Sequence, residues 1–307
     1  MTEQQPRRSR KILRRLSYLF ILLMTAWLVA VQAGCFAMRT PDNEWPEKLL
    51  LQGQHLTPRF CDVPDAKGRM IHFVSIGTAD SLPLIVMVHG SPGASDAYLD
   101  YLADTVLSRQ ARMVTIDRPG FGYTQDFGTP EPSLAAQAAG VRAVVDQIAP
   151  DKKVWLIGHS LGGPVIARFA MDYPEQTAGL ILVAASVDPE EEEHPFWQSA
   201  IDPPPFKWLI PKSFWASNYE IKALEGELRQ MLPLWAGIRC PVTIVHAKDD
   251  QLVPVGNAAF ARRMLVNCPG LKEQILPDGD HFILWNRHGK IRETILDMLK
   301  NARGNFE

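Results

Sequence analysis

The chain has 307 residues, of which 46% are hydrophobic and 21% charged, a balance that suits one large folded domain and excludes a disordered or collagen-like chain. The formal net charge is −2, but six basic residues against Glu3 give the first 15 residues a charge of +5, so the remainder carries about −7. A nucleic-acid partner is not expected, because such proteins usually present a basic surface to phosphate.

The first predicted element is an apolar helix. Residues 16–38 include no charged side chain and lie between Arg15 and Arg39. At about 1.5 Å per residue, a helix over them would span roughly 34 Å, enough to cross a hydrocarbon core of roughly 30 Å. The basic segment 1–15 precedes it, so the positive-inside rule leaves the N-terminus in the cytoplasm and the chain after Arg39 outside. We expect residues 16–38 to be a transmembrane signal-anchor, with the membrane as a partner.

Two other interpretations of this segment stay open. A cleaved secretory signal would be cut near the small residues Ala33 and Gly34 and would release the domain. The stretch "VQAGC" resembles the end of a bacterial lipoprotein signal, in which Cys35 would be acylated. Gln32, however, stands where an aliphatic residue is expected.

Beyond a linker and first strand region at 39–65, apolar runs alternate with helix-like runs. Near-continuous apolar strands separated by helices are typical of a mostly parallel sheet covered on both faces. The sequence therefore predicts one doubly wound α/β core over 66–186 and 240–307. Its expected strands are 70–76, 82–90, 111–120, 153–160, 178–186, 240–250 and 272–281, and its expected helices are 96–109, 133–149, 164–173 and 255–265.

The alternation breaks between residues 187 and 239. This interval has a tight acidic run, three consecutive prolines and four tryptophans. It is too long for an ordinary connection, so we expect it to fold as a helical cap over the sheet.

The four cysteines, at positions 35, 61, 240 and 268, lack the spacing of a metal site, so no bound metal is expected. Cys240 and Cys268 each precede a late predicted strand. In an exported domain they could form a disulfide; two buried free thiols are the alternative.

The expected strand at 153–160 ends in "GHSLGG" and passes directly into an expected helix. A strand-to-helix passage of this kind must turn sharply, and its glycines let neighbouring backbone approach without a Cβ clash. The turn lifts the hydroxyl of Ser160 clear of the sheet. A glycine-rich turn with an idle serine is the alternative interpretation.

Five motifs in order resemble the α/β-hydrolase superfamily, in the branch with a cap domain. "HGSPG" at 89–93 and "DRPGFG" at 117–122 resemble the loops after its third and fourth strands, and "GHSLGG" at 158–163 resembles its nucleophile elbow. "KDDQLVP" at 248–254 and "GDHFILW" at 279–285 resemble its acid and histidine loops. The resemblance covers most of residues 70–300 and implies a serine hydrolase that needs no cofactor.

A serine hydroxyl is a weak nucleophile near neutral pH, so it needs an adjacent base, and that base needs a partner that fixes its tautomer. The resemblance implies Ser160 as nucleophile, His281 as base and Asp250 as acid. Two backbone N–H groups must also stabilise the developing oxyanion, and the resemblance assigns them to Ser91 and Leu161.

The acid is the less certain member of this triad. Asp250 stands four residues before Pro254, as the family pattern requires, whereas Asp249 is one residue early. Asp188, after the expected strand at 178–186, is a position that some relatives use. A solvated or capping aspartate is the alternative role for Asp250.

Aromatic residues of the cap suggest an apolar pocket for a small-molecule substrate with an acyl or aromatic group, or else the cap's own core. The candidate substrate-binding residues are Trp197, Phe206, Trp208 and Trp215. The expected activity is that of a carboxylesterase or lipase-like enzyme. A peptidase resembling proline iminopeptidases, and a membrane-tethered binding protein without turnover, are the alternatives.

Overall fold

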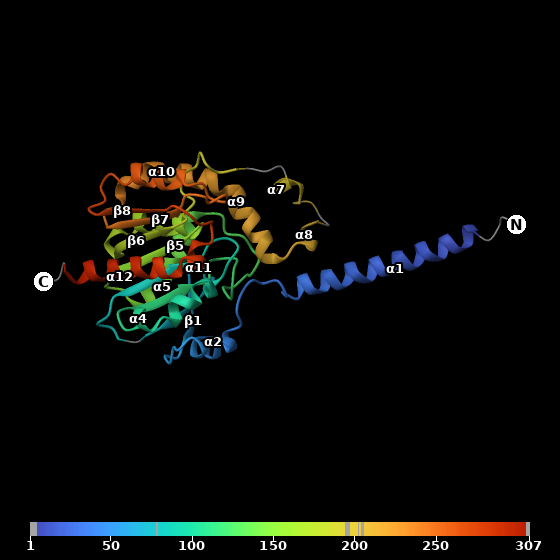
Figure 1. The fold of residues 1–307 in the computed structure, drawn as a ribbon, viewed down its shortest axis with the longest axis horizontal. Helices are drawn as coiled ribbons and strands as arrows, with labels where there is room; N and C mark the ends of the chain where they lie inside the picture. Colours follow the sequence, from blue (N-terminus) through green and yellow to red (C-terminus); the bar gives the residue numbers. More distant parts are fainter. Residues whose placement is uncertain (1–4, 78, 194–196, 202, 204–205, 305–307) are drawn as a thin grey trace.

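The protein is described by a computed structural model, which covers residues 5–77, 79–193, 197–201, 203 and 206–304 (Figure 1). Its centre is an eight-stranded sheet with the order β1-β2-β4-β3-β5-β6-β7-β8. The pairs β1–β2 and β2–β4 are antiparallel, and every later pair is parallel. The strands are β1 Arg59–Pro64, β2 Met70–Ile76, β3 Leu84–Val88, β4 Arg112–Ile116, β5 Val154–His159, β6 Thr177–Val183, β7 Val242–Ala247 and β8 Leu271–Leu276.

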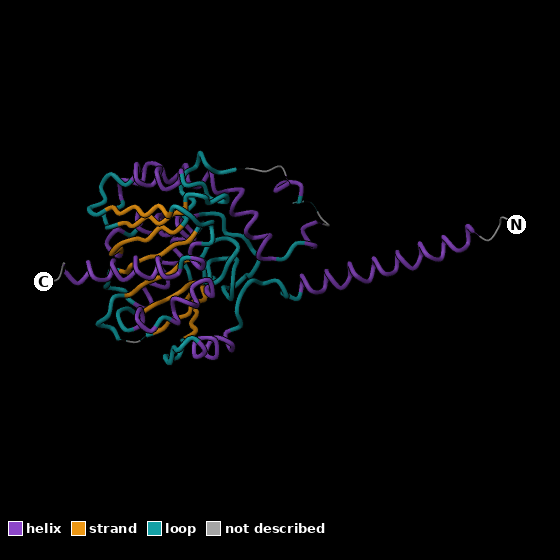
Figure 2. Tube along the Cα trace, viewed as in Figure 1, coloured by secondary structure: helices purple, strands orange, loops and turns teal. Residues whose placement is uncertain are grey.

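Helices cover both faces of this sheet (Figure 2). One face packs against α5 Leu134–Ile148, α6 Gly162–Asp172 and α10 Gly256–Met264. The other packs against α2 Trp45–Leu51, α3 Leu99–Ala103, α4 Thr105–Ser108, α11 Ile283–Asn286 and α12 His288–Gly304. The central strands β3 and β5 are buried along their whole length, which explains their near-continuous apolar sequence. The predicted doubly wound α/β class is confirmed.

The expected helix at 96–109 is divided into three pieces. A 3₁₀ turn, η2 Ser95–Tyr98, leads into α3, and α4 follows after Asp104. Asp104 has extended backbone angles, and its carboxylate accepts hydrogen bonds from the N–H groups of Val106 and Leu107. An aspartate that caps a new helix start also ends the previous helix, which is why the single helix does not form. Two further 3₁₀ turns are η1 Asp42–Glu44 and η3 Pro174–Gln176.

The described residues between β6 and β7 add no strand to the sheet. It contains α7 Trp197–Ala200, α8 Phe206–Leu209, the 20-residue α9 Lys212–Met231 and the 3₁₀ turn η4 Leu232–Gly237. Helix α9 reaches the core through buried Leu224, Leu228 and Met231. We call α7, α8 and α9 the cap.

The N-terminal helix α1 Gln5–Gln32 projects away from the domain, and its apolar side chains from Ile12 to Val29 are mostly exposed (Figure 1). It includes one stretch, Arg10–Gln32, long and apolar enough to cross a membrane. The helix ends at Gln32, before the end of the predicted span 16–38, and Gly34 just beyond it takes a positive φ of 79°. At its other end, α1 begins at Gln5, within the basic segment that was predicted as 1–15.

Candidate active site

Ser160 occupies the turn between β5 and α6 and has a φ of 53°, a left-handed conformation that is uncommon for a residue other than glycine. The glycines around it make this turn possible. A Cβ on Gly158 would overlap the backbone of Gly162, and one on Gly162 would overlap the carbonyl oxygen of Val88. The glycine pattern is therefore required by close backbone packing, and it holds the serine side chain at the carboxyl edge of the sheet.

Asp250 and His281 come together at this edge from the loops after β7 and β8. Asp250 Oδ2 lies 2.8 Å from His281 Nδ1, and both side chains are buried. The second oxygen, Oδ1, accepts hydrogen bonds from the N–H groups of Leu252 and Val253 at 2.9 and 2.8 Å. Asp249, by contrast, is exposed. The structure thus pairs the expected base with Asp250.

Burial raises the pKa of the Asp250 carboxyl, but hydrogen bonds from His246, His281 and Val253 outweigh burial and hold that pKa below its usual range. His246 Nε2 lies 3.5 Å from Asp250 Oδ2. A carboxylate that stays ionised can fix the orientation of the imidazole and stabilise its protonated form.

Asp188, the other candidate acid, has a different role. Its carboxylate accepts a hydrogen bond from the N–H of Glu190, two residues on, and its own N–H donates to Asn257 Oδ1. These contacts shape the loop that leads into the cap.

The imidazole of His281 lies beside the serine turn. Its ring centroid is 4.9 Å from that of His159, the residue before Ser160, and His159 Nε2 lies 3.0 Å from the carbonyl oxygen of His281. Burial, with the neighbouring charge of His281, lowers the pKa of His159 to about 3, so His159 is neutral. Among the residues that the structure describes, no hydrogen bond joins Ser160 Oγ to His281. Such bonds are often long in an unliganded enzyme and shorten when substrate binds.

The two expected oxyanion donors flank Ser160. Leu161 follows it directly, and Gly90, which precedes Ser91, packs so closely that a Cβ there would lie 2.9 Å from Ser160 Cβ. Within the described ranges, neither N–H donates to an acceptor of the chain. Both donors are thus next to the serine and available.

A buried ion pair behind this loop was not identified from the sequence. Arg118, in the loop after β4, contacts Glu220 of cap helix α9, with its two terminal nitrogens 3.0 and 3.2 Å from Oε1 and Oε2. The same guanidinium donates to the carbonyl oxygens of His89 and Gly90, both at 2.9 Å. Glu220 Oε2 also accepts a hydrogen bond of 2.9 Å from Ser91 Oγ. The cap is therefore linked directly to the expected oxyanion loop.

The three candidate substrate-binding aromatics that the structure describes differ in exposure. Trp215 is buried against Tyr219, whereas Phe206 and Trp208 are 52% and 56% exposed. The side chain of Trp197 lies outside the described residues. No cluster of metal-binding side chains occurs in the described part of the chain, and Cys268 Sγ donates to the carbonyl oxygen of Cys240.

Known proteins share this arrangement of fold and sequence. The sequence profile of the alpha/beta hydrolase family matches residues 85–293. A 2-hydroxy-6-oxononadienedioate/2-hydroxy-6-oxononatrienedioate hydrolase of Klebsiella pneumoniae is 24% identical over 289 residues, which cover 82% of this chain and 98% of that protein.

Two solved structures extend the likeness. A membrane phospholipase A described as a bacterial virulence factor superposes with a TM-score of 0.64 at 19% identity, over 94% of this chain and 99% of its own. An esterase from Exiguobacterium antarcticum superposes with a TM-score of 0.63 at 21% identity, over 79% of this chain and 100% of its own. At these identities, the superpositions establish the fold alone.

Proposed function

The chain belongs to the alpha/beta hydrolase family, and on that premise we propose that it hydrolyses carboxylic esters with Ser160 as nucleophile, His281 as base and Asp250 as acid. The observation that carries the proposal is the 2.8 Å hydrogen bond between Asp250 and His281, formed beside a serine in a strained turn. The names of the two structural neighbours, a phospholipase and an esterase, support ester substrates.

The reaction begins when His281 Nε2 accepts the proton of Ser160 Oγ as that oxygen attacks the ester carbonyl carbon. Negative charge develops on the carbonyl oxygen and is stabilised by the N–H groups of Ser91 and Leu161. Collapse of the tetrahedral intermediate breaks the bond to the alcohol, which leaves with the proton held by His281. An acyl-enzyme remains on Ser160.

Water then completes the turnover. His281 accepts a proton from water as the water oxygen attacks the acyl carbon, and the second collapse returns that proton to Ser160 and releases the carboxylic acid. Asp250 stabilises the imidazolium in both steps. His159 stays neutral beside His281 and adds no opposing charge.

The test is chemical labelling followed by a substrate panel. A fluorophosphonate probe should label the wild-type chain and leave Ser160→Ala unlabelled, and p-nitrophenyl esters should be cleaved in preference to prolyl anilides. Cleavage of prolyl anilides alone would favour a peptidase. Folded wild-type protein that takes up no label would favour a binding protein and would contradict the proposal.

We also propose that α1 is a retained membrane anchor. Trp27 Nε1 donates to the carbonyl oxygen of Leu209 at 2.9 Å, and Gln32 Nε2 donates to that of Trp208 at 3.1 Å. A signal cut near Ala33 would remove both donors, so these contacts favour an uncleaved helix. The basic residues before α1 favour a catalytic domain on the outer side.

A further inference from the structure

The carboxyl edge of the sheet, where the candidate active site lies, carries a set of exposed apolar side chains. They come from the exit of α1, from the cap, and from the loops that hold Asp250 and His281. We call them the apolar rim: Phe36, Met38, Phe206, Trp208, Phe214, Leu252, Phe282 and Trp285. Aromatic side chains prevail among them. Tryptophan is enriched at membrane–water interfaces, and phenylalanine and leucine join it on the buried face of helices that lie there.

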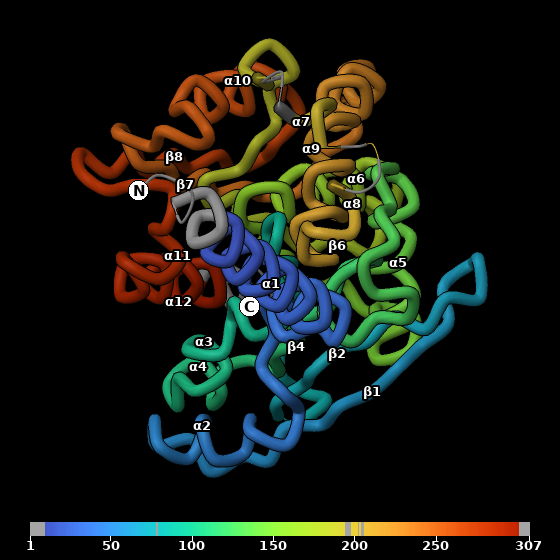
Figure 3. The backbone as a smooth tube through the Cα atoms, turned by 90° about the vertical axis from the view of Figure 1, so that its right-hand side faces the viewer, coloured from blue at the N-terminus to red at the C-terminus, as the bar shows by residue number. Residues whose placement is uncertain are grey.

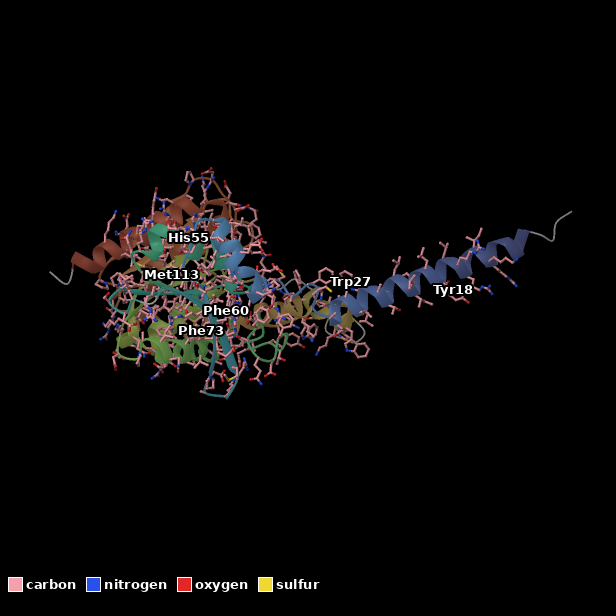
Figure 4. All side chains as sticks on the ribbon, turned by 90° about the horizontal axis from the view of Figure 1, so that it is seen from below. Tyr18, Trp27, His55, Phe60, Phe73 and Met113 are labelled. Carbon is pink, nitrogen blue, oxygen red and sulfur yellow. The ribbon has the colours of Figure 1, made fainter. Side chains whose placement is uncertain are left out.

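Helix α1 leaves the domain at this same edge. In Figure 1 the cap and α11, which follows His281, lie toward the end from which α1 projects. Figure 3 looks at that end, with α1 projecting toward the viewer in front of the middle of the domain. Figure 4 labels Trp27 where α1 meets the cap, whereas Tyr18 lies far out along the helix.

Specific contacts fix α1 to this edge. Besides the bonds from Trp27 and Gln32 to α8, Ser213 Oγ at the start of α9 donates to the carbonyl oxygen of Phe36 at 3.0 Å. On the other side, the Arg39 guanidinium lies 3.9 Å from the ring centroid of Tyr123, in the loop after β4. The helix is therefore joined to the domain by anchored residues rather than by a loose linker.

This junction determines which part of the domain meets a membrane. A helix that crosses a bilayer has its last turn at the membrane surface, and α8 is hydrogen-bonded to the last turns of α1. The apolar rim must then lie at the headgroup level. Lys207 and Lys212 are exposed beside it and can meet lipid phosphates.

We propose that the apolar rim docks on the lipid bilayer and that the substrate is an acyl ester lipid that enters the active site from that bilayer. The chemistry rests on the proposed function, and the bond that breaks is the ester bond between the lipid's acyl group and its alcohol. The docking itself rests on the geometry of α1 and the rim. In this proposal an apolar acyl chain passes from the membrane to Ser160 over the exposed aromatic surface of the rim.

Docking is tested by fluorescence, independently of catalysis. The full chain, with the exposed Cys35 changed to serine, is reconstituted in phosphatidylcholine vesicles. An environment-sensitive label is attached at Phe214→Cys, at Leu252→Cys or, as a control, at Val266→Cys. Val266 is 70% exposed but lies between α10 and the start of β8, at the opposite edge of the sheet.

Labels at 214 and 252 should emit at shorter wavelength in vesicles and be quenched more than about twofold by lipids with brominated acyl chains, while the label at 266 stays unchanged. Equal emission at all three positions would overturn the docking. If the labels at 214 and 252 stay shielded from water in detergent, and more so at higher protein concentration, the rim contacts a second copy of the chain. That result would also overturn docking on the bilayer.

The source of the substrate is tested by rates. The double variant Met38→Ser, Phe214→Ser should lose about tenfold in hydrolysis of an acyl ester lipid in vesicles and keep its rate on a monomeric short-chain ester. The matched variant Leu51→Ser, Val266→Ser, exposed but outside the rim, should keep both rates.

The two proposals fail in different ways. A wild-type chain that cleaves the monomeric ester but not the vesicle lipid would overturn the lipid substrate and leave the esterase. If Ser160→Ala retained both rates, the proposed function would be contradicted, whereas the label positions would still report whether the rim docks.

Discussion

At the scale of single residues, the site depends on a serine held in a conformation that serine rarely adopts. The left-handed backbone of Ser160 is stable only because glycines on both sides let the strand, the turn and the helix pack without Cβ atoms. The sequence pattern was sufficient to predict this turn, since only glycine permits such close packing.

Asp250→Asn should lower kcat for ester hydrolysis by about 10⁴-fold and leave the fold intact, because the amide cannot hold His281 in the required tautomer. Steady-state rates on a p-nitrophenyl ester would measure the loss. Asp249→Asn is the matched control, since Asp249 is exposed and adjacent in sequence. If the Asp249 variant lost more activity than the Asp250 variant, the assignment of the acid would be wrong.

Buried histidines should make the fold sensitive to acid. Burial lowers the pKa of His159 to about 3, and it lowers the pKa of His89 well below its ordinary value of 6.5. Below about pH 6.5 the unfolded chain takes up protons that these folded-state side chains do not. Each histidine should then reduce the free energy of unfolding by up to about 1.4 kcal/mol per pH unit, and for His159 the loss continues until the pH nears its folded pKa.

Urea unfolding between pH 7 and pH 4 would measure this effect. His159→Asn should show a shallower loss of stability with falling pH than the wild type, because it removes one such group. His55→Asn, at an exposed position, should follow the wild-type curve. Parallel curves for all three proteins would contradict the prediction.

At the scale of elements, cap helix α9 contacts the loop that we propose as the oxyanion loop. Glu220 belongs to α9 and accepts hydrogen bonds from Ser91 Oγ and from Arg118. Ser91 thus has two separate parts in the proposed site: its N–H is the proposed oxyanion donor, and its hydroxyl donates to Glu220 of the cap. Glu220 is a positioning residue, since it acts through Ser91.

Ser91→Ala separates these parts, because it keeps the backbone N–H and removes the tie. We expect kcat to fall about tenfold, less than the 10² to 10³ that typically follows deletion of an oxyanion donor, with KM little changed. The urea midpoint should stay near that of the wild type, since the Arg118–Glu220 pair remains. A loss confined to KM would assign the hydroxyl to substrate binding instead.

The elements of the core could be predicted from the sequence, but the cap contacts could not. Apolar strands of a parallel sheet and glycines of a tight turn leave local patterns, and so do the motifs around Asp250 and His281. The pair Arg118–Glu220 joins residues 102 positions apart, and no local pattern indicates that partner. The end of α1 at Gln32 likewise has no local signal in the apolar composition, which continues to Met38. It goes with the positive φ of Gly34 and with the hydrogen bond from Ser213 to the carbonyl oxygen of Phe36.

At the scale of the whole molecule, α1 is part of the folded structure, since Val31 near its end is buried. Cys35→Ser should therefore remain in the membrane fraction, and the mass of the wild-type chain should include α1. Fractionation with mass spectrometry would measure both. Release of the Cys35→Ser variant into the soluble fraction would indicate a lipoprotein, and a mature chain that starts after residue 33 would indicate a cleaved signal.

The buried Arg118–Glu220 pair also constrains how the enzyme can turn over. If α9 swung away as a hinged lid, the guanidinium and the carboxylate would each lose a charged partner in a water-poor interior, at a cost of about 3 to 5 kcal/mol. If α9 instead stays in place, that cost is avoided, and substrates must reach the active site beneath α9. The width of the substrate, rather than the rate at which a lid opens, would then decide which substrates are hydrolysed. Progress curves of the reaction should start without a lag.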